Sequence, residues 1–221
     1  MNEVNTPTAV SPFAFAGVPR VVPRPAAELE PLLDWLRGGR PAGERLDFAA
    51  GTVLPDGRLD LCKQSLGAEG AALVADALRG GSDAERPSPV RHLLLGTDGL
   101  GDEGAAVAAA TATGAKGVET LYLGCNGITA GGACRIADQL RASPQVVTGV
   151  WLKRNPLGPQ GGTAATELIE SVRTLRTLDL VQTGLDAAGT AVLADALLES
   201  AAAGRGGRRG VRGGHTPRPA G

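Results

Sequence analysis

The chain has 221 residues, a formal net charge of −1 and a hydrophobic content of 43%. This charge balance excludes a protein built as a whole to coat nucleic acid or an anionic membrane. Its 33 glycines, against two Trp, one Tyr and three Phe, favour thin repeating layers over one core of bulky side chains. The three cysteines have no CxxC spacing, so neither a disulfide framework nor a zinc site is indicated.

The N-terminal residues 1–24 contain no element that the sequence predicts, and we expect this segment to be disordered. It lacks the early basic cluster and the long apolar run of a signal peptide. No stretch of about 18 apolar residues, the length that spans a membrane, follows later in the chain. These features predict a cytoplasmic protein without membrane contact.

Residues 25–55 are predicted to form an N-terminal cap. Within them, residues 25–39 have the spacing of an amphipathic helix, and residues 46–54 resemble an irregular strand. The apolar side of this helix consists of Leu29, Leu32, Leu33 and Leu36. A repeat array needs such a terminal unit, because its first repeat has no neighbour to cover it.

A repeat occupies residues 56–199. Five segments of it align without gaps, namely 58–70, 92–104, 120–132, 149–161 and 177–189. Each segment begins with two apolar residues on either side of one other residue, an alternation that places both on one face of a short strand. Each ends in glycine, and apolar residues four and eight positions later indicate a helix. One strand and one helix are therefore predicted for each unit.

The pattern LxxLxLxxNxLGxxGxxxLxxxL resembles the ribonuclease-inhibitor-like class of leucine-rich repeats. Asn126 and Asn155 match its turn asparagine, whereas Gln64, Asp98 and Thr183 stand at that position in the other units. The resemblance implies an α/β solenoid of about five repeats with a curved parallel sheet inside and helices outside, and protein binding as the usual role. Looser turns are expected where the amide is replaced, because a buried turn amide needs partners.

Residues 200–221 form an Arg/Gly-rich tail with five arginines and no acid, which leaves a net charge of −6 on residues 1–199. The tail cannot bury apolar area and is predicted to be disordered. Weak, non-specific RNA binding is one hypothesis for it, although it has no aromatic residue to stack on a base. Because no capping unit follows the fifth helix, an apolar edge is expected there, which favours self-association.

The strand residues between the paired apolar positions are expected to face the concave side of the sheet. They are Asp60, Leu94, Tyr122, Trp151 and Asp179. Neighbouring units place Tyr122 beside Trp151, with Lys153 and Arg154 flanking them, which predicts one apolar patch with a basic edge. The alternative is that these side chains only cover the sheet.

Other groups complete the predicted partner-binding surface. Asp60 and Asp179 lie at its two ends and would orient a partner that has a basic rim. His92 borders a strand on the same side, as does Cys62, which has no paired histidine and is expected to be inert.

The segment GLGDEG at 99–104 has the glycine spacing of a dinucleotide-binding loop. Its glycines occupy the turn positions of the repeat, however, and Asp102 and Glu103 place negative charge where a pyrophosphate would bind. We therefore expect neither a cofactor nor a metal site, and no enzyme activity.

The leading hypothesis is an adaptor or inhibitor-type scaffold that binds another protein on its concave sheet. The alternative from another class is a GTPase regulator, because the Ran GTPase-activating proteins are built from similar repeats. No motif in this sequence matches the polar residues through which those proteins act.

Overall fold

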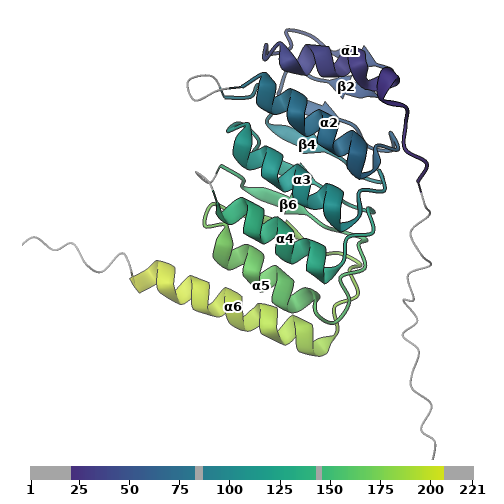
Figure 1. The fold of residues 1–221 in the computed structure, drawn as a ribbon. Coiled ribbons are helices and arrows are strands. Elements are labelled where there is room, and N and C mark those ends of the chain that lie inside the picture. Colours follow the sequence, from purple (N-terminus) through teal and green to yellow (C-terminus); the bar gives the residue numbers. More distant parts are fainter. Residues whose placement is uncertain (1–20, 83–86, 143–145, 207–221) are drawn as a thin grey trace, which may run out of the picture.

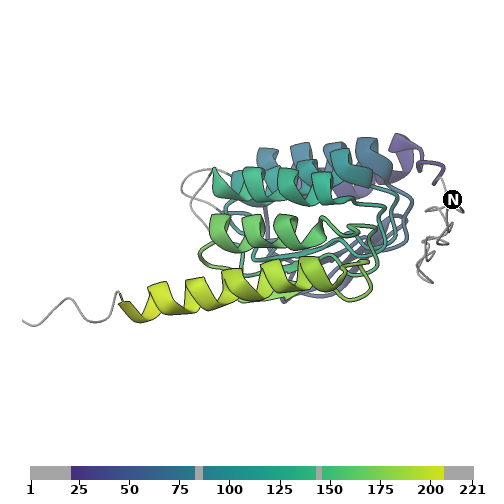
Figure 2. The same ribbon diagram turned by 90° about the horizontal axis from the view of Figure 1, so that it is seen from below.

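A computed structural model describes residues 21–82, 87–142 and 146–206 of the chain. Within these residues, seven strands follow one another in chain order in a single sheet, and six helices pack side by side in one layer against it (Figure 1). Figure 2, which looks along the stack, shows this row of helices curving around the strands. The predicted α/β solenoid is confirmed.

The N-terminal cap consists of helix α1 (Ala26–Arg37) and the strands β1 (Leu46–Phe48) and β2 (Gly51–Val53). β1 pairs with β2, and β2 with the first repeat strand, in antiparallel orientation. The four leucines on one side of α1 are buried, and the rings of Trp35 and Phe48 lie 6.4 Å apart. Large apolar side chains thus close this end of the core.

Each of the five repeats contributes one short strand and one helix. The pairs are β3 (Arg58–Asp60) with α2 (Gly67–Gly80), β4 (His92–Leu94) with α3 (Gly101–Gly114), β5 (Thr120–Tyr122) with α4 (Ala130–Arg141), β6 (Gly149–Trp151) with α5 (Gly161–Ser171) and β7 (Thr177–Asp179) with α6 (Ala187–Gly206). The strands are parallel and in register, and their central residues are Leu59, Leu93, Leu121, Val150 and Leu178. The first four of these are buried, because each unit covers the apolar side of its neighbour.

The turn after each strand has the same backbone conformation in every repeat. The residues there have φ between +56° and +63° although none is glycine; they are Lys63, Thr97, Cys125, Arg154 and Gln182. A left-handed conformation costs free energy for such residues. In the first four, the backbone N–H donates a hydrogen bond to a carbonyl of the next repeat, at 2.8–3.1 Å. The stacked neighbours therefore hold a conformation that an isolated unit would not keep.

Two buried asparagines link the turns of successive repeats. Oδ1 of Asn126 accepts a hydrogen bond from the backbone N–H of Asp98, and Oδ1 of Asn155 accepts one from Asn126, at 2.9 and 2.8 Å. Their side-chain nitrogens donate to strand-end carbonyls of their own repeat and of the preceding one, at 2.7–3.0 Å. Each amide satisfies backbone groups that would otherwise be buried without partners.

Asp98 occupies the asparagine position in the second repeat and links its turn to the preceding one through only one of its carboxylate oxygens. Its Oδ1 accepts a hydrogen bond from the backbone N–H of Gln64 at 2.8 Å, whereas Oδ2 is buried without a partner. The turn keeps its conformation, contrary to the looser turn expected from the sequence, since Thr97 has the same φ as its counterparts. Burial raises the pKa of the Asp98 carboxyl to about 6.

Both predicted boundaries of the folded region are corrected by the structure. Residues 21–24, expected to belong to a disordered segment, pack against the first two repeats. Helix α6 continues to Gly206 instead of ending at 199, because residues 201–203 are alanines, the strongest helix formers. The rest of both terminal segments lies outside the described residues. None of the helices that the structure describes could span a membrane.

We predict that Asp98→Asn stabilises the protein at neutral pH. An asparagine would donate from the position of Oδ2, whereas the native carboxyl loses its proton as the pH rises through about 6. Because this folded-state pKa exceeds the unfolded value of about 3.9, the contribution of Asp98 to the stability is greatest below pH 4 and is lost as the pH rises through about 6. The expected gain at pH 7.5 is about 1–3 kcal/mol, shrinking towards pH 4.5.

Urea unfolding at pH 4.5 and 7.5 measures this difference. Asn126→Asp is the matched control, and it should destabilise the protein more at pH 7.5 than at pH 4.5. A loss of stability in Asp98→Asn at both pH values would show that Oδ2 does not occupy the position of the amide nitrogen.

Candidate functional site

The concave face of the sheet is the surface opposite the helices, and the structure places on it the five strand residues that were predicted to face that side. All are partly exposed, while the residues beside them in the strands point into the core. These five concave-face residues lie in one row across the sheet, in the order Asp60, Leu94, Tyr122, Trp151 and Asp179. An apolar middle is therefore flanked by a carboxylate on each outer repeat strand.

The Tyr122 ring extends from this row towards the carboxyl ends of the strands. A Cβ atom on Gly96 would lie 2.5 Å from its Cε1, and a Cβ on Gly124 would lie 3.3 Å from its hydroxyl oxygen. The two glycines thus form a slot that the ring fills. Nζ of Lys153 lies 5.1 Å from the centre of the ring, within the range of a cation–π interaction.

The Trp151 ring extends in the opposite direction, towards the amino ends of the strands. It lies over Gly149 of its own strand, where a Cβ atom would come within 2.6 Å of Cη2. Although Tyr122 and Trp151 are register partners in neighbouring strands, their rings diverge. The sequence predicts that the two residues lie side by side in one apolar patch, and the structure adds that their rings point in opposite directions. The aromatic surface covers the width of the sheet, because glycines leave room on both sides of the central row.

His92 lies on the same side of the row as the indole of Trp151. Its Nδ1 is 3.0 Å from Oγ1 of Thr120, and the register places His92, Thr120 and Gly149 side by side on successive strands. A half-buried histidine with a hydroxyl partner adds a polar margin to the site.

The other predicted charges are arranged differently from the expectation. Lys153 covers Tyr122, but Arg154 lies on the turn beyond, where its Nε donates to Oε1 of Gln182 at 2.8 Å. Asp60 and Asp179 each accept a hydrogen bond at 3.0 Å from the backbone N–H two residues later. Both acids therefore also support their own turns, in addition to marking the two ends of the row.

The cysteine on the concave face is not activated. Sγ of Cys62 accepts a hydrogen bond from the backbone N–H of Gly96 at 3.3 Å, and burial raises the pKa of the thiol to about 12. Burial likewise raises the pKa of Cys134, on helix α4, to about 11. Both side chains are thus neutral thiols at physiological pH, and the thiolate is the form that reacts.

The GLGDEG segment is occupied by the chain itself. A Cβ on Gly99 would lie 2.6 Å from the side chain of Val21, which covers the loop. The carboxylate of Asp102 accepts hydrogen bonds from the backbone N–H and the hydroxyl of Thr129, both at 2.7 Å. Among the described residues, no group of three or more His, Cys, Asp or Glu side chains could hold a metal ion.

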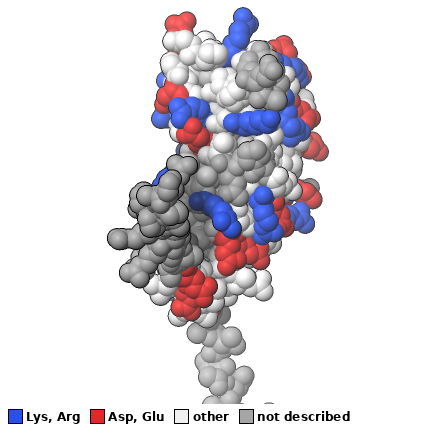
Figure 3. Space-filling model, turned by 90° about the vertical axis from the view of Figure 1, so that its left-hand side faces the viewer, with Lys and Arg blue, Asp and Glu red and all other residues white. Residues whose placement is uncertain are grey.

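The edge of the solenoid formed by the helix carboxyl ends carries interspersed charges of both signs (Figure 3). In three helices an arginine of the last turn pairs with an aspartate three residues earlier, as Arg141 does with Asp138 at 3.0 Å. Arg91 and Glu119 pair across neighbouring repeats at 2.5 Å. Exposed pairs of this kind contribute little stability, but they prevent a surface of a single sign.

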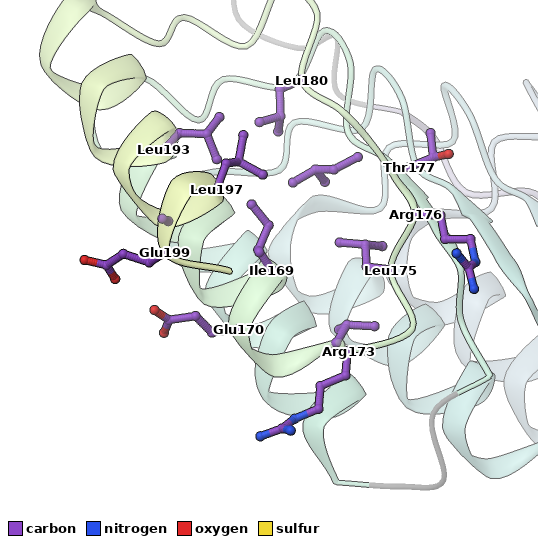
Figure 4. A pocket seen from close by; sticks show the side chains of 13 residues that line it. Ile169, Glu170, Arg173, Leu175, Arg176, Thr177, Leu180, Leu193, Leu197 and Glu199 are labelled. Atoms are coloured by element: carbon purple, nitrogen blue, oxygen red, sulfur yellow. The ribbon is translucent and has the colours of Figure 1, made fainter. Parts of the chain in front are cut away.

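The last repeat leaves an apolar groove between α5, α6 and β7 (Figure 4). Its apolar lining includes Ile169, Leu175, Leu178, Leu180, Leu193 and Leu197. The residues of the first three repeats that correspond to Leu197 are buried by the next unit, whereas Leu197 is 51% exposed. The open edge expected from the sequence is thus present in the structure.

Sequence reasoning missed the part played by Gly96, Gly124 and Gly149 in shaping the concave face. The signal was available in the alignment of the repeats. Glycine stands at positions where other units have larger residues such as Cys62, His92 or Lys153. A glycine beside an exposed aromatic residue in a strand indicates that the ring lies over the backbone.

We predict that Gly149→Ala displaces the indole of Trp151. The added methyl group would overlap the ring, so acrylamide should quench the tryptophan fluorescence more strongly than in the native protein. Gly43→Ala is the control, because no described atom lies within 4 Å of a Cβ at that position. Identical quenching of the Gly149→Ala and native proteins would contradict the position assigned to the ring.

No family model matches the sequence, and no curated protein matches it either. Among solved structures, the chain is similar to Leiomodin-1 Actin-Binding Site 2 (ABS2), with a TM-score of 0.58 and 16% sequence identity. The match covers 81% of this chain and 93% of that one. At this identity the likeness concerns the fold alone, and together with the repeat geometry it shows that the chain folds as a leucine-rich-repeat-like solenoid.

Proposed function

We propose that this protein is a non-enzymatic scaffold, of the adaptor or inhibitor type, that binds another protein on the concave face of its sheet. The observation that carries the proposal is the aromatic surface formed by Tyr122 and Trp151. Both rings lie over glycines on a rigid sheet, so little side-chain entropy would be lost when a partner covers them. Partly exposed aromatic residues in such positions are typical anchors of protein interfaces.

The charges around the rings support a partner with mixed chemistry. Lys153 beside Tyr122 would attract an acidic or carbonyl-rich element near the centre, and Asp60 and Asp179 would attract basic groups at the two ends. Leu94 extends the apolar middle by one repeat. We infer a protein partner that presents an apolar segment with charged flanks.

The structural neighbour is consistent with this type of role. Leiomodin-1 Actin-Binding Site 2 is, by its name, a region that binds actin, and actin is a protein. The likeness gives no reason to name actin as the partner of this chain. We further propose the ribonuclease-inhibitor-like class of repeat, since the last four strands begin 28 or 29 residues apart and every strand is followed by a helix.

The chemistry of the described side chains supports a non-enzymatic role. Cys62 is a neutral thiol, and Nδ1 of His92 lies within hydrogen-bond distance of the hydroxyl of Thr120. The glycine-rich loop at 99–104 is covered by Val21. We therefore assign the site to binding, in a cytoplasmic setting suited to free thiols.

We predict that Trp151→Ala and Tyr122→Ala each weaken binding of the partner by about tenfold or more, because truncation of an interface anchor costs about 2 kcal/mol. Affinity capture from cell extract identifies the proteins that the native chain retains, and titration with the purified partner gives the dissociation constants. Arg135→Ala is the matched control, since this exposed side chain lies on the outer helix α4.

The double variant Tyr122→Ala, Trp151→Ala should lose the proteins that the native chain and Arg135→Ala both retain. Circular dichroism must show unchanged helix content, which separates loss of the surface from loss of the fold. Equal affinity of the native and double-variant chains would eliminate the concave face as the binding site.

The other functions considered from the sequence stay predictions. The Arg/Gly tail beyond residue 206 lies outside the described residues, and removal of residues 207–221 would abolish nucleic-acid binding if the tail carries it. A GTPase-stimulation assay tests the regulator hypothesis, for which no described residue supplies a motif. Self-association through the open groove is tested by the experiment of the following section.

A further inference from the structure

The segment before α1 packs along the ridge of turns that join strands to helices. The backbone N–H of Arg24 donates a hydrogen bond to the carbonyl of Ser65 at 2.8 Å. The Arg24 guanidinium also donates to the backbone carbonyl and to Oε1 of Gln64, both at 3.0 Å. Pro23 lies against Gly67. All of these contacts are made to the turn of the first repeat.

The same segment then crosses to the second repeat, where Val21 lies over Gly99. Val22, between the two contacting residues Val21 and Pro23, is 84% exposed. Three residues, roughly 10 Å of extended chain, therefore carry the segment across one repeat. Traced back from α1, it runs towards the later repeats (Figure 1).

Beyond Val21, each of the next three turns contains a glycine with positive φ. Gly127, Gly158 and Gly184 occupy the turns of the third, fourth and fifth repeats with φ between +65° and +79°. No described atom lies within 4 Å of the position of a Cβ on Gly158. Gly127 and Gly184 align with Gly99, whereas the fourth repeat has Pro156 at that position and Gly158 two residues later. An extended chain that continues in the direction of residues 24 to 21 would therefore meet a glycine at the third and fifth turns and the Pro156 side chain at the fourth.

This path leads to the apolar groove of the last repeat. The groove opens next to the end of the ridge at Leu180, and Val181, the following residue, is 60% exposed. Leu193 of α6 faces Leu180 across the groove (Figure 4). In the part of the chain that the structure describes, no further repeat covers the core here, so large apolar side chains from another segment would gain the burial free energy that the inner repeats already have.

Residues 1–20, which lie outside the described residues, include two of the three phenylalanines of the chain, Phe13 and Phe15. Six to eight residues separate them from Val21, roughly 20–26 Å of extended chain. Three repeats span a comparable distance, since neighbouring turns advance by about 5–10 Å, between the spacings of strands and of helices. We propose that the N-terminal segment continues along the turn ridge and docks Phe13 and Phe15 in the open groove, closing the C-terminal end of the solenoid.

The other segment outside the structure is a poorer match to the groove. Residues 207–221 contain one large apolar residue, Val211, among four arginines. A second copy of the chain could place its own phenylalanines in the groove, but a tethered segment has an effective concentration in the millimolar range and would outcompete it. The intramolecular arrangement is therefore favoured.

Photo-crosslinking in the full-length chain tests the proposal. Phe15→p-benzoylphenylalanine is prepared in ¹⁴N- and ¹⁵N-labelled forms, which are mixed in equal amounts and irradiated, and the crosslinked peptides are identified by mass spectrometry. The expected crosslinks join position 15 to residues 175–198 within chains of one isotope. Val211→p-benzoylphenylalanine is the control and should not label the groove.

Crosslinks between isotopes would overturn the proposal by assigning the groove to a second copy, and an absence of crosslinks to residues 175–198 would overturn it as well. Hydrogen exchange gives a second, independent readout. In the double variant Phe13→Ser, Phe15→Ser, the amides of residues 175–198 should exchange at least tenfold faster than in the native protein, whereas the amides of β5 should exchange at the native rate. In the control variant Val4→Ser, the amides of residues 175–198 should also exchange at the native rate. Unaltered exchange of residues 175–198 would also contradict the docking.

Discussion

No repeat of this chain can bury its own apolar side chains, and the rest of the structure follows from that constraint. One strand of three residues and one helix leave an open side, which only the next unit covers. The left-handed turns are held in the same way, since their backbone N–H groups donate to the following repeat. Asn126 and Asn155 extend this dependence to the buried turn amides. Each repeat therefore depends on its neighbours for stability, and the repeats at the two ends of the stack differ from those in the middle because they have a neighbouring repeat on one side only.

The same constraint shapes the concave face. Because the apolar residues of each strand point to the helices, the alternate residues are free to vary without loss of the core. In this chain the freedom is used for Tyr122 and Trp151, with glycines beneath both rings. The glycines have a cost in strand stability, which the stacked neighbours offset. A scaffold whose core tolerates such changes is well suited to recognition, because the surface can be altered independently of the fold.

The fold could be predicted from the sequence because its signals are periodic. The spacing of apolar pairs, turn residues and glycines recurs five times, so each unit supports the interpretation of the others. The concave positions of Tyr122 and Trp151 followed from strand alternation. The direction of their rings did not, because it depends on where glycines stand, both in the same repeat and in the neighbouring one. The packing of Val21 over Gly99 and the unpartnered oxygen of Asp98 likewise depend on contacts between repeats that no local pattern describes.

Native-state hydrogen exchange of the central strand residues measures the interdependence of the repeats most directly. Neighbours that stabilise one another should open together, so the amides of Leu93, Leu121 and Val150 are expected to exchange with the same free energy and to respond equally to urea. Destabilisation of the fourth repeat by Asn155→Ala should lower that free energy for all three. If Leu93 kept its protection while Val150 lost it, the repeats would be independent units, and the account of a shared core would be contradicted.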